Sequence, residues 1–219
     1  MAGACHKSLV KRLIRLSTTR HCVGDQTVKK DDEIKARKVP FSVRLAVVAV
    51  FSALIAVGTT VLSIHLPAPL YEIGAAPAIY LALSALSDRW TAFYATAIGG
   101  FIGETYNIAF FGGGSPIYPF GIVWARGPEA FIVAYAANKG PKWLAASMVI
   151  ATGFETLAFF FPDWLFYTYG LFQYSVPAGS TPLGLALFDF GTLADLIWIP
   201  VAFAIIYAAR PAFRRLGFR

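Results

Sequence analysis

Long apolar runs dominate the chain from residue 41 onward, and short polar stretches separate them. The runs cover approximately residues 44–64, 70–87, 91–111, 117–138, 142–162 and 183–209. Each is close to the ~20 apolar residues that an α-helix needs to cross a bilayer. The pattern therefore predicts six transmembrane helices. The second has the shortest uninterrupted apolar stretch because it contains Glu72 and Pro77.

Composition supports the same class of protein. Of the 219 residues, 57% are hydrophobic and only 14% are charged, and the mean hydropathy is +0.60. Soluble domains carry about 25% charged residues. We therefore expect an all-α integral membrane protein, with a six-helix domain over residues 41–219.

The net charge of +7 does not indicate a nucleic-acid-binding protein, because ten of the nineteen Lys and Arg lie before residue 41 and most others flank apolar runs. Residues 1–40 are predicted to form a basic cytoplasmic tail. Its alternation of apolar and basic residues suits an amphipathic helix on membrane lipid, a frayed tail or a start site assigned too early. Cys5 and Cys22 match no common zinc motif, so no metal or cofactor is expected.

The basic residues also predict an orientation. With the tail in the cytoplasm, the inner loops lie near residues 88–90, 139–142 and 210–219 and contain Lys and Arg. The outer loops, near 65–70, 112–116 and 163–182, contain neither residue. This positive-inside asymmetry predicts a multi-pass protein of the cell membrane with both termini cytoplasmic.

Six acidic or basic residues lie inside the predicted spans and away from their ends, and only one of them is basic. They are Glu104, Arg126, Glu129, Glu155, Asp189 and Asp195. Such groups normally face the bundle interior and pair. With five acids to one base, some acids must be protonated, solvated or paired with something other than protein.

The depths of these residues predict a pocket. At ~1.5 Å per residue, Glu104, Arg126, Glu155 and Asp189 fall roughly 9–14 Å below the outer surface, with Glu129 and Asp195 deeper. Asn107 lies on the face of Glu104.

The stretch "VWARGPEAF", residues 123–131, adds a helix break. Pro128 cannot donate a hydrogen bond to the carbonyl of Trp124, and Gly127 lets another group approach the backbone closely. The alternative to a polar pocket is a purely structural ion network around Arg126.

Small residues recur at helical spacing on two spans. Ala95, Gly99 and Gly103 on the third favour packing within the bundle. The first span carries Ala46, Ala49, Ala53 and Ala56 within "RLAVVAVFSALIAV".

That Ala-x-x-x-Ala pattern, together with six helices whose two ends lie inside, resembles the substrate-binding S components of energy-coupling factor (ECF) transporters. The resemblance extends to the stretches "LPAPLYEIGAAPAIYLALSAL" and "AIGGFIGETYNIAFFGGG". The resemblance covers about residues 41–215.

The resemblance implies a non-enzymatic protein that binds a vitamin or similar micronutrient from outside. Its first helix, through the four alanines, would dock on a transmembrane coupling protein driven by two ABC-type ATPases. Substrate contacts in the family come mainly from helices four to six and the outer loops, which points to Arg126, Glu129, Glu155, Trp164 and Asp189. Spans three and four add Glu104, Asn107 and Trp124. The excess of acids favours a cationic or amine-bearing substrate, thiamine-like or a pyrimidine precursor.

Two other classes compete with this interpretation. An autonomous proton-coupled secondary transporter would use the carboxylates as a proton relay, although such carriers usually show internal repeats and none is convincing here. An intramembrane enzyme is disfavoured because the spans contain no Cys or His and no Gly-x-Gly-Asp motif. On one α-helix, Asp189 and Asp195 would point about 120° apart.

Overall fold

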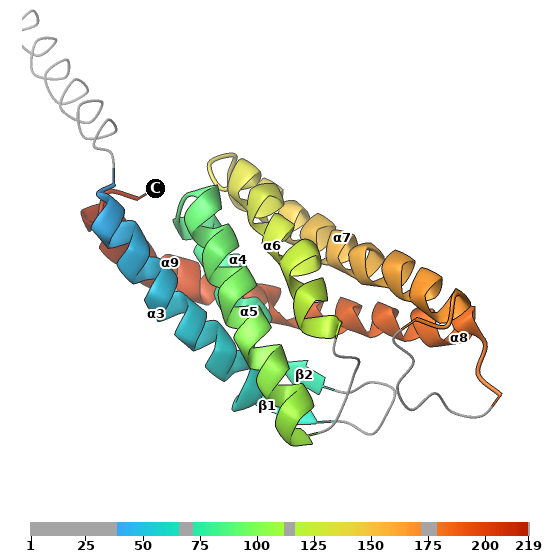
Figure 1. The fold of residues 1–219 in the computed structure, drawn as a ribbon. Coiled ribbons are helices and arrows are strands. Elements are labelled where there is room, and N and C mark those ends of the chain that lie inside the picture. The colour runs from blue at the N-terminus through green and yellow to red at the C-terminus, as the bar shows by residue number, and fades with distance from the viewer. Residues whose placement is uncertain (1–38, 66–71, 112–116, 172–178, 219) are drawn as a thin grey trace, which may run out of the picture. The chain divides into compact units, whose positions relative to one another are not determined.

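The computed structural model describes residues 39–65, 72–111, 117–171 and 179–218. These residues are mostly helical (Figure 1). The elements in chain order are α3 (Phe41–Thr60), β1 (Ser63–His65), β2 (Glu72–Gly74), α4 (Ala76–Leu86), α5 (Arg89–Phe111), α6 (Tyr118–Ala136), α7 (Pro141–Thr168), α8 (Pro182–Ala186), the 3-10 helix η1 (Leu187–Trp198) and α9 (Ile199–Arg215). The predicted tail over residues 1–40 lies almost wholly outside the described residues.

Every predicted segment contains a helix, so the prediction of a mostly helical protein is confirmed. Helix α7 continues six residues beyond its predicted end at 162, because Pro162 lies inside the helix without ending it. The last segment is divided into α8, η1 and α9.

The second predicted segment was wrong at its start. A two-stranded antiparallel hairpin, with Ser63 opposite Gly74, stands where the helix was expected to begin. Helix α4 then has only 11 residues and carries a proline in its first turn. Proline fits there because the first helical amides have no partner within the helix. The helix therefore begins at Ala76, well after residue 70.

Three helices of the described chain are long and apolar enough to cross a membrane. They are α3, α7 and the continuous stretch Pro182–Arg215. Helix α4 is apolar but shorter. Helices α5 and α6 have 23 and 19 residues, but they contain several glycines together with Glu104, Arg126 and Glu129.

Helix α4 lies at the centre of the bundle. All but one of its eleven residues are buried, and Tyr80, Leu81, Leu83 and Leu86 are among the largest fully buried side chains. It contacts α3, α5, α6 and α9. A helix enclosed in this way presents its side chains to protein on almost every side, which explains why its sequence is apolar all round.

Helices α3 and α5 lie side by side along most of their length (Figure 1). A Cβ atom on Gly99 would lie 2.5 Å from the carbonyl oxygen of Ser52, and one on Gly103 would lie 2.8 Å from Cβ of Thr59. The Ser52 hydroxyl also donates to the carbonyl of Ala95 at 3.2 Å. The prediction that the small residues of the third span serve packing is confirmed.

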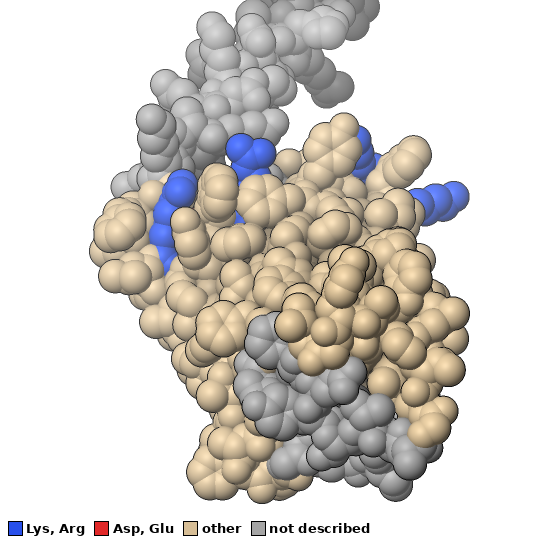
Figure 2. Space-filling model, turned by 45° about the vertical axis from the view of Figure 1, so that its right-hand side comes forward, with Lys and Arg blue, Asp and Glu red and all other residues tan. Residues whose placement is uncertain are grey.

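The basic residues described in the structure, Arg126 apart, lie near helix ends. They are Arg44, Arg89, Lys139, Lys142, Arg210, Arg214 and Arg215. The start of α3, the α4–α5 and α6–α7 turns and the end of α9 are gathered at one end of the unit (Figure 1). On the face in Figure 2, blue side chains follow this end, and no acidic side chain is visible among the described atoms.

Candidate functional site

Four elements bring polar groups together inside the apolar bundle. Arg126 of α6 donates from Nε to Oε1 of Glu155 on α7 at 2.5 Å. The Tyr80 hydroxyl of α4 lies 3.3 Å from the other Glu155 oxygen and 3.4 Å from Oδ2 of Asp195 on η1. The Arg126 guanidinium also lies 6.0 Å from the centre of the Tyr80 ring. We call Tyr80, Arg126, Glu129, Glu155 and Asp195 the central cluster.

The central cluster is closed off from solvent. Glu155 is fully buried, and the Arg126 side chain is only 14% exposed. Glu129 is 1% exposed and interacts with Glu155, yet neither of its carboxyl oxygens makes a hydrogen bond of standard geometry to a described residue. Buried carboxyl oxygens without donors are uncommon in folded proteins. The cluster therefore has more acceptor capacity than the described protein groups use.

A second group of polar side chains lies beside the central cluster. The Tyr118 hydroxyl donates to Oδ1 of Asp189 at 2.8 Å, while Oδ2 of Asp189 is buried without a described partner. The Thr156 and Thr192 hydroxyls are 2.7 Å apart. Asp163 of α7 lies within electrostatic range of Asp189. We call Tyr118, Thr156, Asp163, Asp189 and Thr192 the second cluster.

The 3-10 geometry of η1 joins the two clusters. A 3-10 helix has three residues per turn and rises about 2 Å per residue. Asp189, Thr192 and Asp195 are three residues apart in sequence, so they form one row on the same face, about 12 Å long. The expectation that the two aspartates point about 120° apart is wrong because it assumed an α-helix. Both are buried against α7 and its neighbours.

Glu104 connects the clusters from α5. It is half-buried and lies within electrostatic range of both Arg126 and Tyr118. Arg126 thus has four carboxyl groups around it, from Glu104, Glu129, Glu155 and Asp195. Of the residues predicted from sequence, the structure brings Glu104, Arg126, Glu129 and Glu155 together, with Asp189 next to them.

The other predicted site residues lie elsewhere. The Asn107 amide donates to the carbonyl of Thr59 at 3.3 Å, so this side chain helps to join α5 to α3. Trp124 is 38% exposed and donates to the carbonyl of Ala158 on α7 at 3.2 Å. Trp164 is 40% exposed and stacks on Phe160.

Helix α6 runs without interruption from Tyr118 to Ala136, with Pro128 inside it. The predicted break at this proline is therefore wrong. The ring removes one backbone donor, and packing on α5 and α7 holds the helix together on both sides. The close approach at Gly127 is present, because a Cβ atom there would lie 2.8 Å from the Phe93 ring.

Sequence reasoning missed five polar members of the site, including Thr156 and Thr192. Tyr80 and Tyr118 lie in runs that read as apolar, and each hydroxyl contacts a carboxyl group. Asp163 was placed in an outer loop, although it is buried on α7. The sequence pattern did not reveal this residue because Pro162, just before it, suggested that the helix had ended.

The alanine stripe of α3 faces away from the bundle. Ala46, Ala49 and Ala53 are exposed and Ala56 is half-buried, whereas the opposite face of α3 contacts α5. Leu45, Val50 and Leu54 extend the exposed apolar surface.

Comparison with known protein families, with characterised proteins and with solved structures found no match to this chain. Its function must therefore be argued from the site. The central cluster offers one guanidinium, one phenol and several carboxyl groups in a largely buried environment. Such a set can bind a small polar molecule, pass protons between acids or hold the helices together. In the described ranges, no three His, Cys, Asp or Glu side chains are arranged so that they could hold a metal ion.

Proposed function

We propose that the chain is the substrate-binding S component of an ECF-type importer, which takes up a vitamin or related micronutrient. The observation that carries the proposal is the environment of Arg126, whose largely buried guanidinium lies within electrostatic range of four carboxyl groups. Three of these belong to the central cluster, and the fourth is Glu104 of α5. The resemblance noted in the sequence gives this cluster a role, which is to line an outward-facing substrate pocket.

The proposed topology has six crossings with both termini in the cytoplasm. The distribution of charge supports it, since the described Lys and Arg other than Arg126 lie at one end of the bundle (Figures 1 and 2). The short helix α4 fits this topology because it is enclosed by other helices. Backbone that is not helical, such as the β1–β2 hairpin, is tolerated at membrane depth where protein or a cavity surrounds it.

We propose a cationic or amine-bearing substrate. Three buried carboxyl oxygens, two on Glu129 and one on Asp189, have no described hydrogen-bond donor. An ammonium or amino group supplies such donors, and it offsets the excess of acids over Arg126. The coupling protein, driven by two ABC-type ATPases, would dock on the exposed alanine face of α3, where small side chains permit close helix contact.

The alternative is an autonomous proton-coupled carrier. It is favoured by the row of Asp189, Thr192 and Asp195 on η1, because acids in a row beside other carboxyl groups could relay protons. The two proposals differ in one measurable way. A carrier transports alone in liposomes under a pH gradient, whereas an S component transports only with its coupling module.

The first test is to purify the full chain in mild detergent, denature it and identify the released small molecules by mass spectrometry. The key variant is Arg126→Gln with Glu155→Gln, which removes the central ion pair while keeping side chains of similar size. The control is Lys142→Gln, which removes an exposed charge outside both clusters.

We expect a stoichiometric micronutrient from the native chain and the control, and none from the folded double variant. If folded native protein releases nothing, it is not a tight binder and the ion network is structural. If the double variant retains the compound, the compound binds somewhere other than the central cluster.

A further inference from the structure

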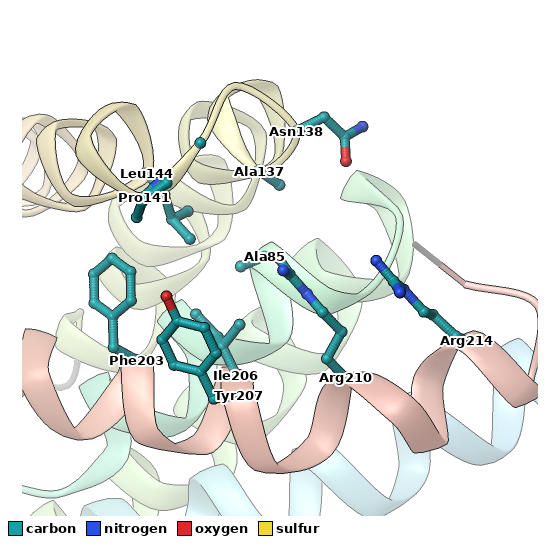
Figure 3. Close-up of a pocket in the computed structure, with 11 residues that line it drawn as sticks. Ala85, Ala137, Asn138, Pro141, Leu144, Phe203, Ile206, Tyr207, Arg210 and Arg214 are labelled. Carbon is teal, nitrogen blue, oxygen red and sulfur yellow. The ribbon is translucent and has the colours of Figure 1, made fainter.

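A second cavity lies at the basic end of the bundle, away from the central cluster. Its volume is about 250 Å³, and residues of α4, the α6–α7 turn, α7 and α9 line it. Figure 3 shows Arg210 and Arg214 of α9 extending towards the turn that carries Asn138. Pockets for drug-sized ligands measure about 300–1,000 Å³. This cavity suits a smaller group.

Neither arginine of this cavity forms an ion pair with an acidic residue in the described part of the chain. The ion pairs found within the described ranges are Arg44 with Asp88 and Arg126 with Glu155. Arg210 is half-buried, so part of its charge lies within the cavity wall. A guanidinium in that position binds phosphate well because its planar set of donors matches phosphate oxygens.

Helix α7 adds to the positive potential of the cavity. The helix begins at Pro141, which lines the cavity, and its N-cap residue Gly140 supplies no side-chain hydrogen bond. Pro141 has no N–H and the Leu144 amide donates to the carbonyl of Gly140, so the start of this 28-residue helix contributes the positive end of its dipole and not a free amide. The helix end strengthens the case made by the arginines.

The wall of the cavity next to the arginines is apolar. Leu144 and Ile206 are buried there, and the rings of Phe203 and Tyr207 border the space on α9 (Figure 3). Tyr207 is 63% exposed, so its ring continues onto the outer surface of the helix. A soluble anion would leave this apolar wall without a contact. A lipid satisfies both walls, because its phosphate contacts the arginines and its glycerol and first methylenes lie along the rings.

We infer that this cavity binds the phosphate headgroup of an anionic phospholipid, in the leaflet facing the basic end of the bundle. Basic pockets between membrane helices on the cytoplasmic side bind such headgroups. The site is separate from the central cluster, so the inference does not depend on which substrate the chain carries.

The test measures lipid binding to the full chain in detergent by native mass spectrometry, with phosphatidylglycerol and phosphatidylcholine as probes. The variant is Arg210→Gln with Arg214→Gln. Its matched control is Lys142→Gln with Arg215→Gln, which removes the same charge from exposed residues at the same end. We expect phosphatidylglycerol to bind the native chain and the control more tightly than phosphatidylcholine does. Its affinity for the cavity variant should fall about thirtyfold.

A third variant, Asn138→Trp, keeps both arginines and places a ring at the mouth of the cavity from an exposed position. It should weaken phosphatidylglycerol binding even if the double variant does not fold. Equal losses in the control would mean that surface charge alone attracts the lipid. Displacement of the lipid by an equal concentration of inorganic phosphate would mean that the site recognises a soluble anion. Either result, or unchanged binding to Asn138→Trp, overturns the inference.

Discussion

Arg126→Gln should destabilise the protein more than removal of Arg126 and Glu155 together. In the native protein the Glu155 carboxylate, which is fully buried, accepts a hydrogen bond from Arg126 at 2.5 Å. Loss of the guanidinium leaves Glu155 facing Asp195 and Glu129 with no cation among the cluster residues. Removing one partner of a buried ion pair costs about 3–5 kcal/mol, because an uncompensated charge stays inside.

Arg126→Gln, Glu155→Gln and the double variant form a double-mutant cycle. Glu155→Gln and the double variant should lose less free energy of unfolding than Arg126→Gln. In Glu155→Gln, Arg126 still has Glu104, Glu129 and Asp195 around it, so the loss is close to that of one charge-assisted hydrogen bond, about 1.5–3 kcal/mol. The double variant replaces both charges by amides that can bond each other, and paired replacement of a buried ion pair is often nearly neutral. The cycle should therefore show a favourable coupling between the two residues.

Thermal unfolding in one detergent, followed by circular dichroism, measures these differences. For a protein of this size a loss of 1 kcal/mol lowers Tm by about 2–4 °C, so Arg126→Gln should unfold about 10 °C below the native chain. The double variant should unfold at a higher temperature than Arg126→Gln. If the two single losses simply add in the double variant, Arg126 and Glu155 act independently and the ion-pair reasoning is refuted.

Three further predictions concern helix contacts. Ala53→Trp should prevent co-purification with the coupling protein while substrate still binds, whereas Ala109→Trp, at an exposed position on α5, should not. Gly103→Val should lower the free energy of unfolding by about 1–3 kcal/mol because its Cβ would meet Thr59, while Gly153→Ala, where a Cβ meets nothing within 4 Å, should be near neutral. Tyr118→Phe should cost about 1–3 kcal/mol by leaving a buried carboxyl oxygen without its donor, measured in the same unfolding assay.

The sequence predicted the helices well and their local geometry less well. Apolar runs of about twenty residues located α3, α5, α6 and α7 because length and apolarity are visible without tertiary contacts. The 3-10 conformation of η1 was not predicted. Its sequence, "LFDFGTLADLIW", contains nothing that excludes an α-helix, so packing of the surrounding helices must select the tighter winding. Because η1 is a 3-10 helix and not an α-helix, Asp189 and Asp195 lie on the same face of it.

The candidate site was predictable where charge stands out against apolar neighbours. Arg126, Glu129 and Glu155 could be found because each interrupts a run that should contain no charge. Tyr80 could not, because a tyrosine in an apolar helix reads as a core residue until its hydroxyl is seen beside a carboxyl group. Trp124 and Trp164 stay predictions, since both are partly exposed and an aromatic residue near a predicted pocket can equally well face outward.

The balance of donors and acceptors bears on whether the two clusters exist only to hold the helices together. A purely structural network would be expected to satisfy its own members, since each buried acceptor left without a donor costs about 1–3 kcal/mol. Here Oδ2 of Asp189 lacks a donor among the described residues, and Glu129 interacts with Glu155, another acid, without a hydrogen bond of standard geometry. The remaining described cations lie at helix ends. Structural need alone does not account for so many acids around Arg126. A molecule or ordered water that brings hydrogen-bond donors into this region does account for them.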